Sequence, residues 1–421
     1  MRYSPWLTLF ALSLLVFGCQ DAESPAGDDP STESGTVTAT PNPTSDPLLG
    51  SPVASLSELP IRISEEGGYI WDLETERLFK LDSQPLWSPD GSMAAINYCC
   101  SGPDYFLNVF DPSTGQHFRV EHGGVVGPTW SPDGSLLAFS RRLGPPISAF
   151  GIGIYSIKPD GTELTELSNA ENVSALNWSP DGRFVAFNTD VPGLGGRAYL
   201  LDVASRNVVE ITKDLGGAYY LPLPQWSPDG TYLSICGDYR EALDKPRNPF
   251  YLYGVADQSL RTIVEDGCSH VYWSPDGTRF LLSTGSDSTI NWVDGRLPPV
   301  PFPHAREPAW SPVGQSVAYI TDDCLDEGWH VQIFAADGSS NIRVTDTPAA
   351  YKEGLAWSAD GRQVTFVLPA APESNLVSVD IDTREVKTLA VSQLQFVQGR
   401  WAPGGRFLGL GAGAGGHGVC D

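Results

Sequence analysis

The sequence predicts an all-β protein, a single eight-bladed β-propeller of four-stranded antiparallel blades that is closed by both termini; seven blades is the alternative. The stretch Trp-Ser-Pro-Asp-Gly recurs along the chain, helical periodicity is hard to find beyond the first 20 residues, and the two ends of the repeat region complement each other. The repeats are 37 to 48 residues apart, which suits a four-stranded propeller blade of about 40–45 residues. Their tryptophans are Trp87, Trp130, Trp178, Trp226, Trp273, Trp310, Trp357 and Trp401.

One repeat, residues 225–264, illustrates the expected blade. A short first strand ends at Trp226, and Ser-Pro-Asp-Gly forms a tight turn because proline presets φ and glycine accepts positive φ. Residues 232–236, 250–255 and 260–264 are rich in β-formers and are the next three strands. We expect the tryptophans to fill the core between neighbouring sheets. The Asp-Gly pairs are turn residues, because they lack the ligand density of a calcium loop.

The repeat resembles that of the TolB-type β-propeller family, whose hallmark is Pro-x-Trp-Ser-Pro-Asp-Gly followed by a strand. Pro85, Pro128, Pro224 and Pro308 stand at the matching position, and the resemblance covers roughly residues 61–411. It implies a WD40-like propeller. It does not imply one function, since such repeats occur both in partner-binding periplasmic proteins and in propellers that cap serine peptidases.

The start of the chain predicts export. Residues 1–18 carry one positive charge and then an apolar run, as in a signal peptide. The sequence Val-Phe-Gly-Cys that ends at Cys19 resembles the cleavage box of bacterial lipoproteins, which implies lipidation of Cys19 and anchoring to the periplasmic or extracellular face of the cell envelope. Ordinary secretion is the alternative. Residues 19–60 are rich in Ser, Thr and Pro and read as a disordered tether.

The propeller is expected over residues 61–421, with one blade shared between the termini. Residues 69–73 and 78–81 resemble third and fourth strands with no preceding repeat motif, whereas Trp401 and residues 407–410 supply only first and second strands. Joining them closes the ring and removes exposed sheet edges. The short spacing between Trp273 and Trp310 keeps the seven-blade alternative open.

Six cysteines other than Cys19 form an even set, as expected of disulfides in an exported protein. We predict a Cys236–Cys268 bond, because one ends a second strand and the other lies in the loop that leaves the same blade. Cys420 is expected to form a disulfide with either Cys99 or Cys100, and Cys324 with whichever of these two remains. All six map to one face or its rim; buried single thiols are the alternative.

The same face carries the irregular connections between second and third strands, residues 141–151, 190–196, 237–249 and 321–328. Long loops on a rigid scaffold commonly bind ligands. The residues three positions before a tryptophan are expected at the channel mouth, with loop residues around them. The candidate binding residues are Gln84, His270, Glu307, Gln398, Tyr239, Arg240, Asp322, Asp323, Asp326 and Trp329.

The chemistry of the sequence favours binding over catalysis. It contains no Gly-x-Ser-x-Gly elbow, His-Glu-x-x-His motif or P-loop, its histidines have no metal spacing, and no cofactor is expected. A net charge of −25 disfavours nucleic acid as a partner and leaves a lipid anchor as the expected contact with a membrane. We therefore expect a monomeric, non-catalytic lipoprotein that binds an envelope protein, peptide or glycan. The alternative is a carboxylate-dependent glycan hydrolase or lyase using a pair such as Glu307 and Asp323.

Overall fold

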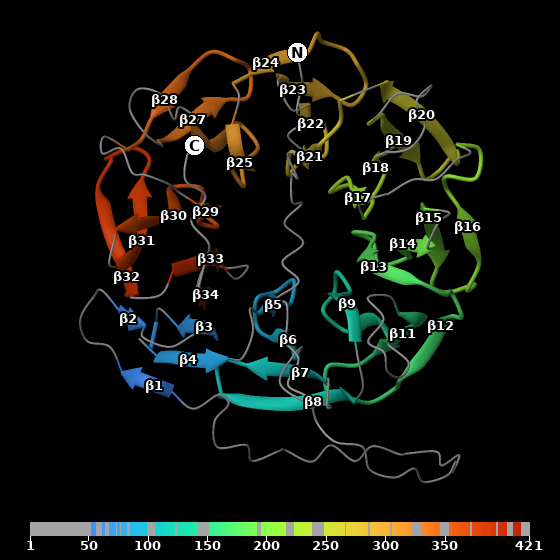
Figure 1. Ribbon diagram of the computed structural model, residues 1–421, viewed down its shortest axis with the longest axis horizontal. Coiled ribbons are helices and arrows are strands. Elements are labelled where there is room, and N and C mark those ends of the chain that lie inside the picture. Colours follow the sequence, from blue (N-terminus) through green and yellow to red (C-terminus); the bar gives the residue numbers. More distant parts are fainter. Residues whose placement is uncertain are drawn as a thin grey trace, which may run out of the picture. The chain divides into compact units, whose positions relative to one another are not determined.

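The computed structural model describes residues 52–413 with gaps, the longest at 99–105, 142–150, 216–222, 238–247, 322–329 and 346–352. The described residues form 34 strands in eight sheets, which follow one another around a ring (Figure 1). No helix occurs among these residues, so none of them belongs to a helix that could cross a membrane. The prediction of eight blades is confirmed, and the seven-blade alternative is wrong, because the short 273–310 interval still holds four strands.

Six blades are each built from four consecutive strands, with neighbouring strands antiparallel. The first three of these are β5 (Leu86–Trp87), β6 (Ala94–Tyr98), β7 (Phe106–Asp111) and β8 (Gln116–His122); β9 (Val125–Trp130), β10 (Leu137–Arg141), β11 (Ile152–Ile157) and β12 (Thr165–Ser168); and β13 (Val173–Trp178), β14 (Phe184–Val191), β15 (Gly195–Asp202) and β16 (Val208–Glu210).

The next three are β17 (Gln225–Trp226), β18 (Tyr232–Cys236), β19 (Phe250–Gly254) and β20 (Ser259–Val264); β21 (His270–Trp273), β22 (Arg279–Thr284), β23 (Asp287–Trp292) and β24 (Val300–Phe302); and β25 (Ala305–Trp310), β26 (Ser316–Thr321), β27 (Val331–Ala335) and β28 (Asn341–Arg343). The first strand of a blade lies innermost, where it touches the neighbouring blade (Figure 1).

The ring is closed by a blade made from both ends of the chain, as the sequence predicts. β33 (Gln395–Trp401) and β34 (Phe407–Gly413) are its inner strands, and β3 (Gly67–Asp72) and β4 (Arg77–Leu81) are its outer ones. β3 pairs antiparallel with β34 in an unbroken register from Gly67↔Ala412 to Asp72↔Phe407. The chain therefore cannot open at this point without breaking a central pair of strands.

Two short N-terminal strands add to neighbouring blades. β1 (Pro52–Ser55) pairs antiparallel with β4 at the outer edge of the closing blade. β2 (Ile61–Ile63) pairs in parallel with β32 (Val386–Ser392), the outer strand of the blade formed with β29 (Glu353–Trp357), β30 (Gln363–Ala370) and β31 (Glu373–Asp380). β1 lies within the predicted 19–60 tether, so that boundary was placed too late. A sheet edge supplies the backbone partners that this short segment lacks by itself.

One strand prediction is also wrong. Residues 190–196 were expected to be an irregular insertion, but β14 and β15 continue as a hairpin through Asp190↔Gly196 and Val191↔Gly195. Continuing the ladder satisfies backbone N–H and C=O groups that a loop would leave to water.

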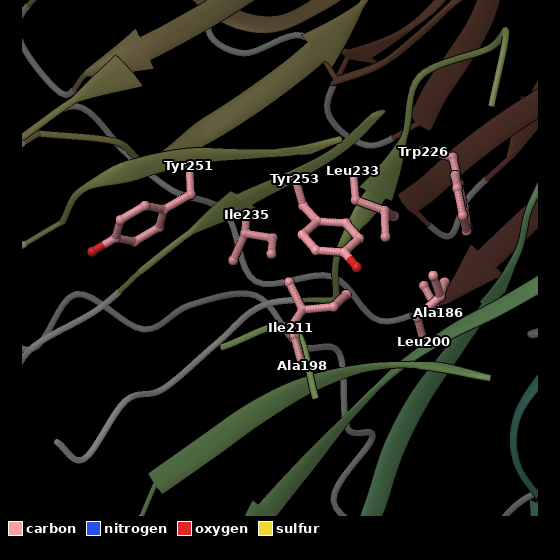
Figure 2. Close-up of a cluster of buried hydrophobic side chains, with 9 residues drawn as sticks. All are labelled: Ala186, Ala198, Leu200, Ile211, Trp226, Leu233, Ile235, Tyr251 and Tyr253. Carbon is pink, nitrogen blue, oxygen red and sulfur yellow. The ribbon is translucent and has the colours of Figure 1, made fainter. Parts of the chain in front are cut away.

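The hydrophobic core lies between the blades. In Figure 2, Leu200 and Ile211 from the β13–β16 blade pack against Leu233, Ile235 and Tyr253 from the β17–β20 blade. Similar buried clusters lie between other pairs of neighbouring blades. In one of them, Ile70 and Phe79 of the closing blade pack against Phe110 of the next blade. Since each cluster draws on two blades, no blade buries its apolar face alone.

The repeat tryptophans join successive blades by hydrogen bonds as well as by packing. The indole N–H of a tryptophan donates to the backbone carbonyl just before the tryptophan of the preceding blade, as in Trp130 to Leu86 (2.9 Å), Trp226 to Asn177 (3.1 Å), Trp310 to Tyr272 (2.9 Å) and Trp357 to Ala309 (2.9 Å). Seven of the eight lie in inter-blade clusters: Trp130, Trp178, Trp226 and Trp357 are buried, and Trp87, Trp273 and Trp310 are half-buried. Their predicted role as core residues is confirmed for these positions.

Replacing Trp226 by Phe should destabilise the protein by about 1–3 kcal/mol, because the carbonyl of Asn177 loses its donor while most of the ring volume stays. Trp178 offers a matched control: it is as well buried, but its indole nitrogen has no hydrogen-bond partner among the described residues. We expect Trp178→Phe to cost less than Trp226→Phe in urea unfolding. Equal costs would contradict the role assigned to the hydrogen bond.

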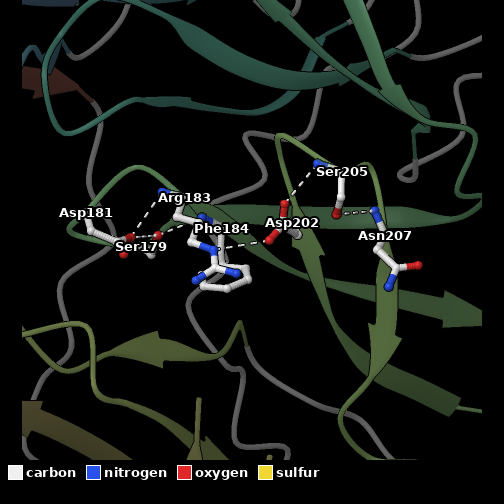
Figure 3. Close-up of polar contacts among 7 residues, drawn as sticks. All are labelled: Ser179, Asp181, Arg183, Phe184, Asp202, Ser205 and Asn207. Carbon is white, nitrogen blue, oxygen red and sulfur yellow. Dashed lines mark hydrogen bonds and ion pairs between the residues drawn. The ribbon is translucent and has the colours of Figure 1, made fainter. Parts of the chain in front are cut away.

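The Ser-Pro-Asp-Gly segments are tight turns held by their own side chains. In Figure 3, the Ser179 hydroxyl donates to the Asp181 carboxylate (2.5 Å), which also accepts the N–H of Arg183 (3.0 Å). The Phe184 N–H donates back to the Ser179 hydroxyl (2.8 Å), and Gly182 takes a φ of 71°. The same bonds recur around Asp90, Asp133, Asp229, Asp276 and Asp360, which confirms their assignment as turn residues.

These turns make stability depend on pH. The Ser131 hydroxyl is the main cause that lowers the pKa of Asp133, and Ser88 and Ser358 act alike on Asp90 and Asp360. Because these pKa values are lower in the folded than in the unfolded chain, the stabilisation is present above the unfolded value of about 3.9 and is lost as pH falls through the folded values. We expect the thermal midpoint to fall in that acid range, and less steeply in Asp133→Asn. An unchanged midpoint there would contradict this.

Candidate functional site

The first strand of each blade begins on one face of the propeller. The connections between second and third strands lie on this same face. On this face the chain between β18 and β19 spans residues 237–249, and that between β26 and β27 spans residues 322–330. Of the ten predicted binding residues, the structure places the side chains of His270 and Glu307, on the neighbouring inner strands β21 and β25. Gln398 lies on β33, but its side chain and the other seven predicted residues, Gln84, Tyr239, Arg240, Asp322, Asp323, Asp326 and Trp329, lie outside the described residues.

The predicted Cys236–Cys268 disulfide is confirmed, with Cα atoms 5.6 Å apart. It joins the end of β18 to the segment just before β21. The N–H of Cys268 also donates to the carbonyl of Asn248 (2.7 Å), and that of Gly237 to Pro249 (2.8 Å). The base of the 237–249 connection is therefore fixed to the start of the next inner strand. Cys99, Cys100, Cys324, Cys420 and the lipidation candidate Cys19 lie outside the described residues.

A similar set of bonds closes the base of the 322–329 connection. Thr321 and His330 exchange backbone and hydroxyl hydrogen bonds, including the N–H of Thr321 to the carbonyl of His330 (2.9 Å). The buried His330 ring lies 3.1 Å from the Thr345 carbonyl through Nδ1 and 2.8 Å from Arg343 Nη2 through Nε2. His330 is thus a structural residue that anchors this connection.

The backbone of Glu307 adopts an unusual conformation. Its φ of 48° lies in the left-handed region, which costs a residue with a Cβ atom about 1–2 kcal/mol. The equivalent positions of two other blades, three residues before their tryptophans, are Gly127 (φ 58°) and Gly354 (φ 68°). The pairing of all three strands shifts register here, as in a β-bulge. Two sister blades use glycine where this blade retains glutamate.

The Glu307 carboxylate points across to the next blade. Its Oε2 accepts the N–H of Gly354 (2.7 Å) and that of Leu355 (3.3 Å), both on β29. Burial of the carboxyl group raises its pKa more than these bonds and the neighbouring Arg306 lower it. The residue is nevertheless exposed to solvent. Both facts fit a position inside a channel mouth, where water reaches a group that protein surrounds on most sides.

Tyr272, on β21, was not singled out from the sequence; its side chain packs in the cluster between its own blade and the β25–β28 blade. Burial, with a further contribution from the charge of Glu307, raises its pKa to about 12, so the phenol stays protonated. The His270 and Tyr272 rings stack with centroids 6.1 Å apart, and burial lowers the pKa of His270.

The His270 imidazole and the Glu307 carboxylate, on two adjacent inner strands, are groups that can hold a polar or cationic ligand group. Within the described part of the chain, no three His, Cys, Asp or Glu side chains come together as a metal site would require. The proposed catalytic pair of Glu307 and Asp323 falls partly outside the described residues.

A cavity of about 530 Å³ lies away from this site, between the β17–β20 and β21–β24 blades. Buried Leu252 and Phe280 line its apolar part. Arg261 lines its rim together with Arg296, whose guanidinium lies 3.8 Å from the centre of the Trp292 ring. The two sites share no residue.

A match to the family described as "WD domain, G-beta repeat" covers residues 258–294, from β20 through β23. Actin-interacting protein 1 of Drosophila melanogaster is 28% identical over 247 residues, which are 54% of this chain. The match spans 38% of that protein's length.

Two solved structures share the fold. An oligogalacturonate lyase from Vibrio parahaemolyticus superposes with a TM-score of 0.51 at 13% identity, covering 72% of this chain and 90% of the lyase. Dipeptidyl peptidase 4 from Porphyromonas gingivalis gives 0.55 at 15% identity, over 72% of this chain and 52% of the peptidase. TolB from Acinetobacter baumannii gives 0.39 at 15% identity, over 78% and 79%. With its eight closed sheets and its repeated Trp-Ser-Pro-Asp-Gly turns, the chain is a β-propeller, and residues 258–294 match the WD-domain repeat.

Proposed function

We propose that this propeller is a non-catalytic, exported protein whose loop-rich face binds a protein, peptide or glycan partner at the mouth of the channel. The observation that carries the proposal is Glu307, a charged residue held in a left-handed conformation where sister blades use glycine. Strain of this kind persists where the surrounding structure enforces it, and it is common at functional sites.

Two further observations support the proposal. The Cys236–Cys268 disulfide suits an oxidising compartment outside the cytosol, and it fixes a long connection beside the site. The Drosophila relative is named for its interaction with actin, which favours protein binding as the general role of such a propeller. Actin itself is not implied for this chain.

Photo-crosslinking tests the location of the binding face. A benzoylphenylalanine at position 270 lies at the channel mouth, whereas one at position 313 lies in a tight turn on the opposite face, where Val313 is 68% exposed. We expect illumination of native envelopes to give discrete adducts from position 270 and none from position 313. Adducts from position 313 alone would mean that the partner binds the opposite face, which would contradict the proposal.

The alternative function is a glycan hydrolase or lyase that uses Glu307. The pKa of this carboxyl group is raised by burial, which is the direction that a general acid requires. The oligogalacturonate lyase likeness shows the shared fold and makes oligogalacturonate a sensible first substrate. Chain cleavage that disappears in Glu307→Gln would establish the enzyme; no cleavage of acidic or neutral glycans would favour binding.

We also propose that the protein is a lipoprotein anchored through Cys19, as the Val-Phe-Gly-Cys sequence suggests. Two or more acyl chains would give the stable anchoring that one chain does not. Metabolic labelling with a radioactive fatty acid should mark the wild-type protein and leave Cys19→Ala unlabelled. Equal labelling of the two proteins would rule out lipidation at Cys19 and leave ordinary secretion as the explanation of the N-terminal sequence.

A further inference from the structure

We propose that the outer edge of β20 takes up an extended peptide segment of a partner protein. The segment adds to the β17–β20 blade as a fifth strand and places an apolar and an acidic side chain over the cavity of about 530 Å³ beside it. β20 lies at the outer rim of the ring, away from the innermost strands that surround the channel (Figure 1). The inference therefore goes beyond the proposed function and does not rest on it.

Outer strands of this propeller already accept an added strand at two places. β1 pairs with β4 and β2 pairs with β32, which have five and seven residues. Among the other outer strands that the structure describes, β8 has seven residues and β20 has six, whereas β12, β16, β24 and β28 have three or four. Of the long outer edges, those of β8 and β20 are the two to which no described strand is added.

A bulge in β20 does not close this edge. The pairing of β20 with β19 shifts register between Thr262 and Val264, and such irregularities can discourage further pairing. β32 has the same irregularity between Thr388 and Ala390. β2 nevertheless pairs with β32 from Ala390 onward. An outer strand of this shape can therefore still receive another strand.

The next blade covers β8 but stands away from β20. Equivalent turns join the third and fourth strands of three blades, with the N–H of Gly161, Gly295 or Gly338 donating to the carbonyl three residues earlier. An added Cβ at Gly161 would lie 3.4 Å from the Arg119 carbonyl oxygen on β8, and one at Gly338 would lie 3.0 Å from Val300 on β24. An added Cβ at Gly295 would meet no atom within 4 Å. The cavity occupies the space left beside β20, and Gly295 lines it.

The cavity offers apolar surface to a side chain of the added strand. Ile263 on β20 and Leu297 after β23 line its open side and are 38% and 53% exposed. An apolar group placed there would remove both side chains from water, which is favourable. Arg261 lines the same cavity two positions before Ile263. Two residues of the added strand that are separated by one position would therefore lie beside Arg261 and Ile263.

The charge at the rim favours an acidic residue beside Arg261. This arginine is exposed and forms no ion pair with a described residue; its guanidinium lies 5.6 Å from the centre of the Tyr232 ring. Arg296 lies over Trp292, and its ion pair with Asp294 is long (3.8 Å) and exposed. Opposite charges on neighbouring strands stabilise a sheet. The expected segment thus carries an acidic and an apolar residue separated by one position.

A second copy of this chain fits the edge less well than such a segment. Two β20 strands paired antiparallel about their centres would bring the two Arg261 side chains toward one another, and like charges across strands are destabilising. Each copy also carries a net charge of −25, which opposes association.

The test uses two peptides of opposite direction, because β1 is antiparallel and β2 is parallel to its partner. Fluorescently labelled Thr-Val-Thr-Leu-Thr-Glu-Thr-amide and Thr-Glu-Thr-Leu-Thr-Val-Thr-amide place leucine beside Ile263 and glutamate beside Arg261 in the antiparallel and the parallel orientation, respectively. Both are titrated against the full-length protein by fluorescence anisotropy, together with versions that carry lysine in place of glutamate. The protein variants are Arg261→Glu and, as a control with the same change of charge, Arg206→Glu in the exposed turn before β16.

We expect one of the two glutamate peptides to bind the wild-type protein. Arg261→Glu should weaken this binding about fivefold or more, because an attractive cross-strand pair becomes a repulsive one. Arg206→Glu should leave the affinity unchanged, and the lysine version of the same peptide should bind Arg261→Glu better than it binds the wild-type protein. Equal weakening by the two variants, or no binding of either glutamate peptide at its solubility limit, would overturn the inference.

Hydrogen exchange distinguishes strand addition from contacts of side chains alone. With the bound peptide, the amides of residues 259–264 should exchange more slowly, since the added strand pairs with the outer edge of β20, and those of β8 should not change. Binding without protection of residues 259–264 would contradict strand addition. A peptide-free protein that sediments as a dimer, and that Ile263→Ser converts to a monomer, would show that a second copy occupies the edge instead.

Discussion

A chain lacking residues 61–82 should not fold to a soluble monomer. The deletion removes β3 and β4, so β34 loses its register partner and the ring is left with an open edge. It also removes Phe79, which is fully buried with its ring 5.3 Å from that of Phe110. We expect aggregated protein in size-exclusion chromatography and loss of the cooperative unfolding transition.

Two companion variants make this result quantitative. Phe79→Ala keeps the ring closed and should cost about 3–5 kcal/mol, which a urea titration can measure. Deleting residues 20–50, whose composition is that of a tether, should leave the unfolding midpoint unchanged. A stable monomer from the 61–82 deletion would mean that closure by β3 and β34 does not hold the ring together.

Removing the Cys236–Cys268 bond should destabilise the protein by about 3–4 kcal/mol, as the chain-entropy model gives for a sequence separation of 32 residues. Cys268 is also buried beside Phe250 and Phe280, so the double alanine variant loses some packing as well. We expect a lower thermal midpoint in Cys236→Ala/Cys268→Ala than in the wild-type protein.

The reduced wild-type protein separates the two contributions, because it keeps both sulfur atoms in place. Its midpoint should fall between those of the oxidised protein and the double variant. We also expect weaker crosslinking from position 270 after reduction, since the 237–249 connection is then tied to β21 by backbone hydrogen bonds alone. Identical midpoints with and without reductant would contradict the stabilising role of the bond.

Retention of Glu307 in a strained conformation suggests how stability and binding are balanced in this propeller. Gly127 and Gly354 adopt the same bulge without a Cβ atom. At Glu307 the fold accepts the strain and offsets part of it with the two hydrogen bonds to β29. Sites that place functional groups in this way commonly sacrifice some stability.

The sequence by itself determined the features that depend on local chemistry and on period. Ser-Pro-Asp-Gly encodes its turn completely, since the Ser and Asp side chains bond to backbone groups within five residues and glycine supplies the positive φ. The regular spacing of the motif then determined the number of blades, and the incomplete repeats at the two ends determined the closure. The Cys236–Cys268 pairing followed from the same alignment of blades, because both positions map to one end of one blade.

Only the tertiary structure decided the features that arise between blades. The Glu307 carboxylate meets N–H groups 47 and 48 residues away, and the charge of Glu307 acts on Tyr272 from the next inner strand. No local pattern encodes such contacts, because each depends on how two blades are rotated against one another. The pairing of β1 with β4 and of β2 with β32 is of the same kind. Each of these short segments becomes a strand where the folded ring offers it an unpaired edge.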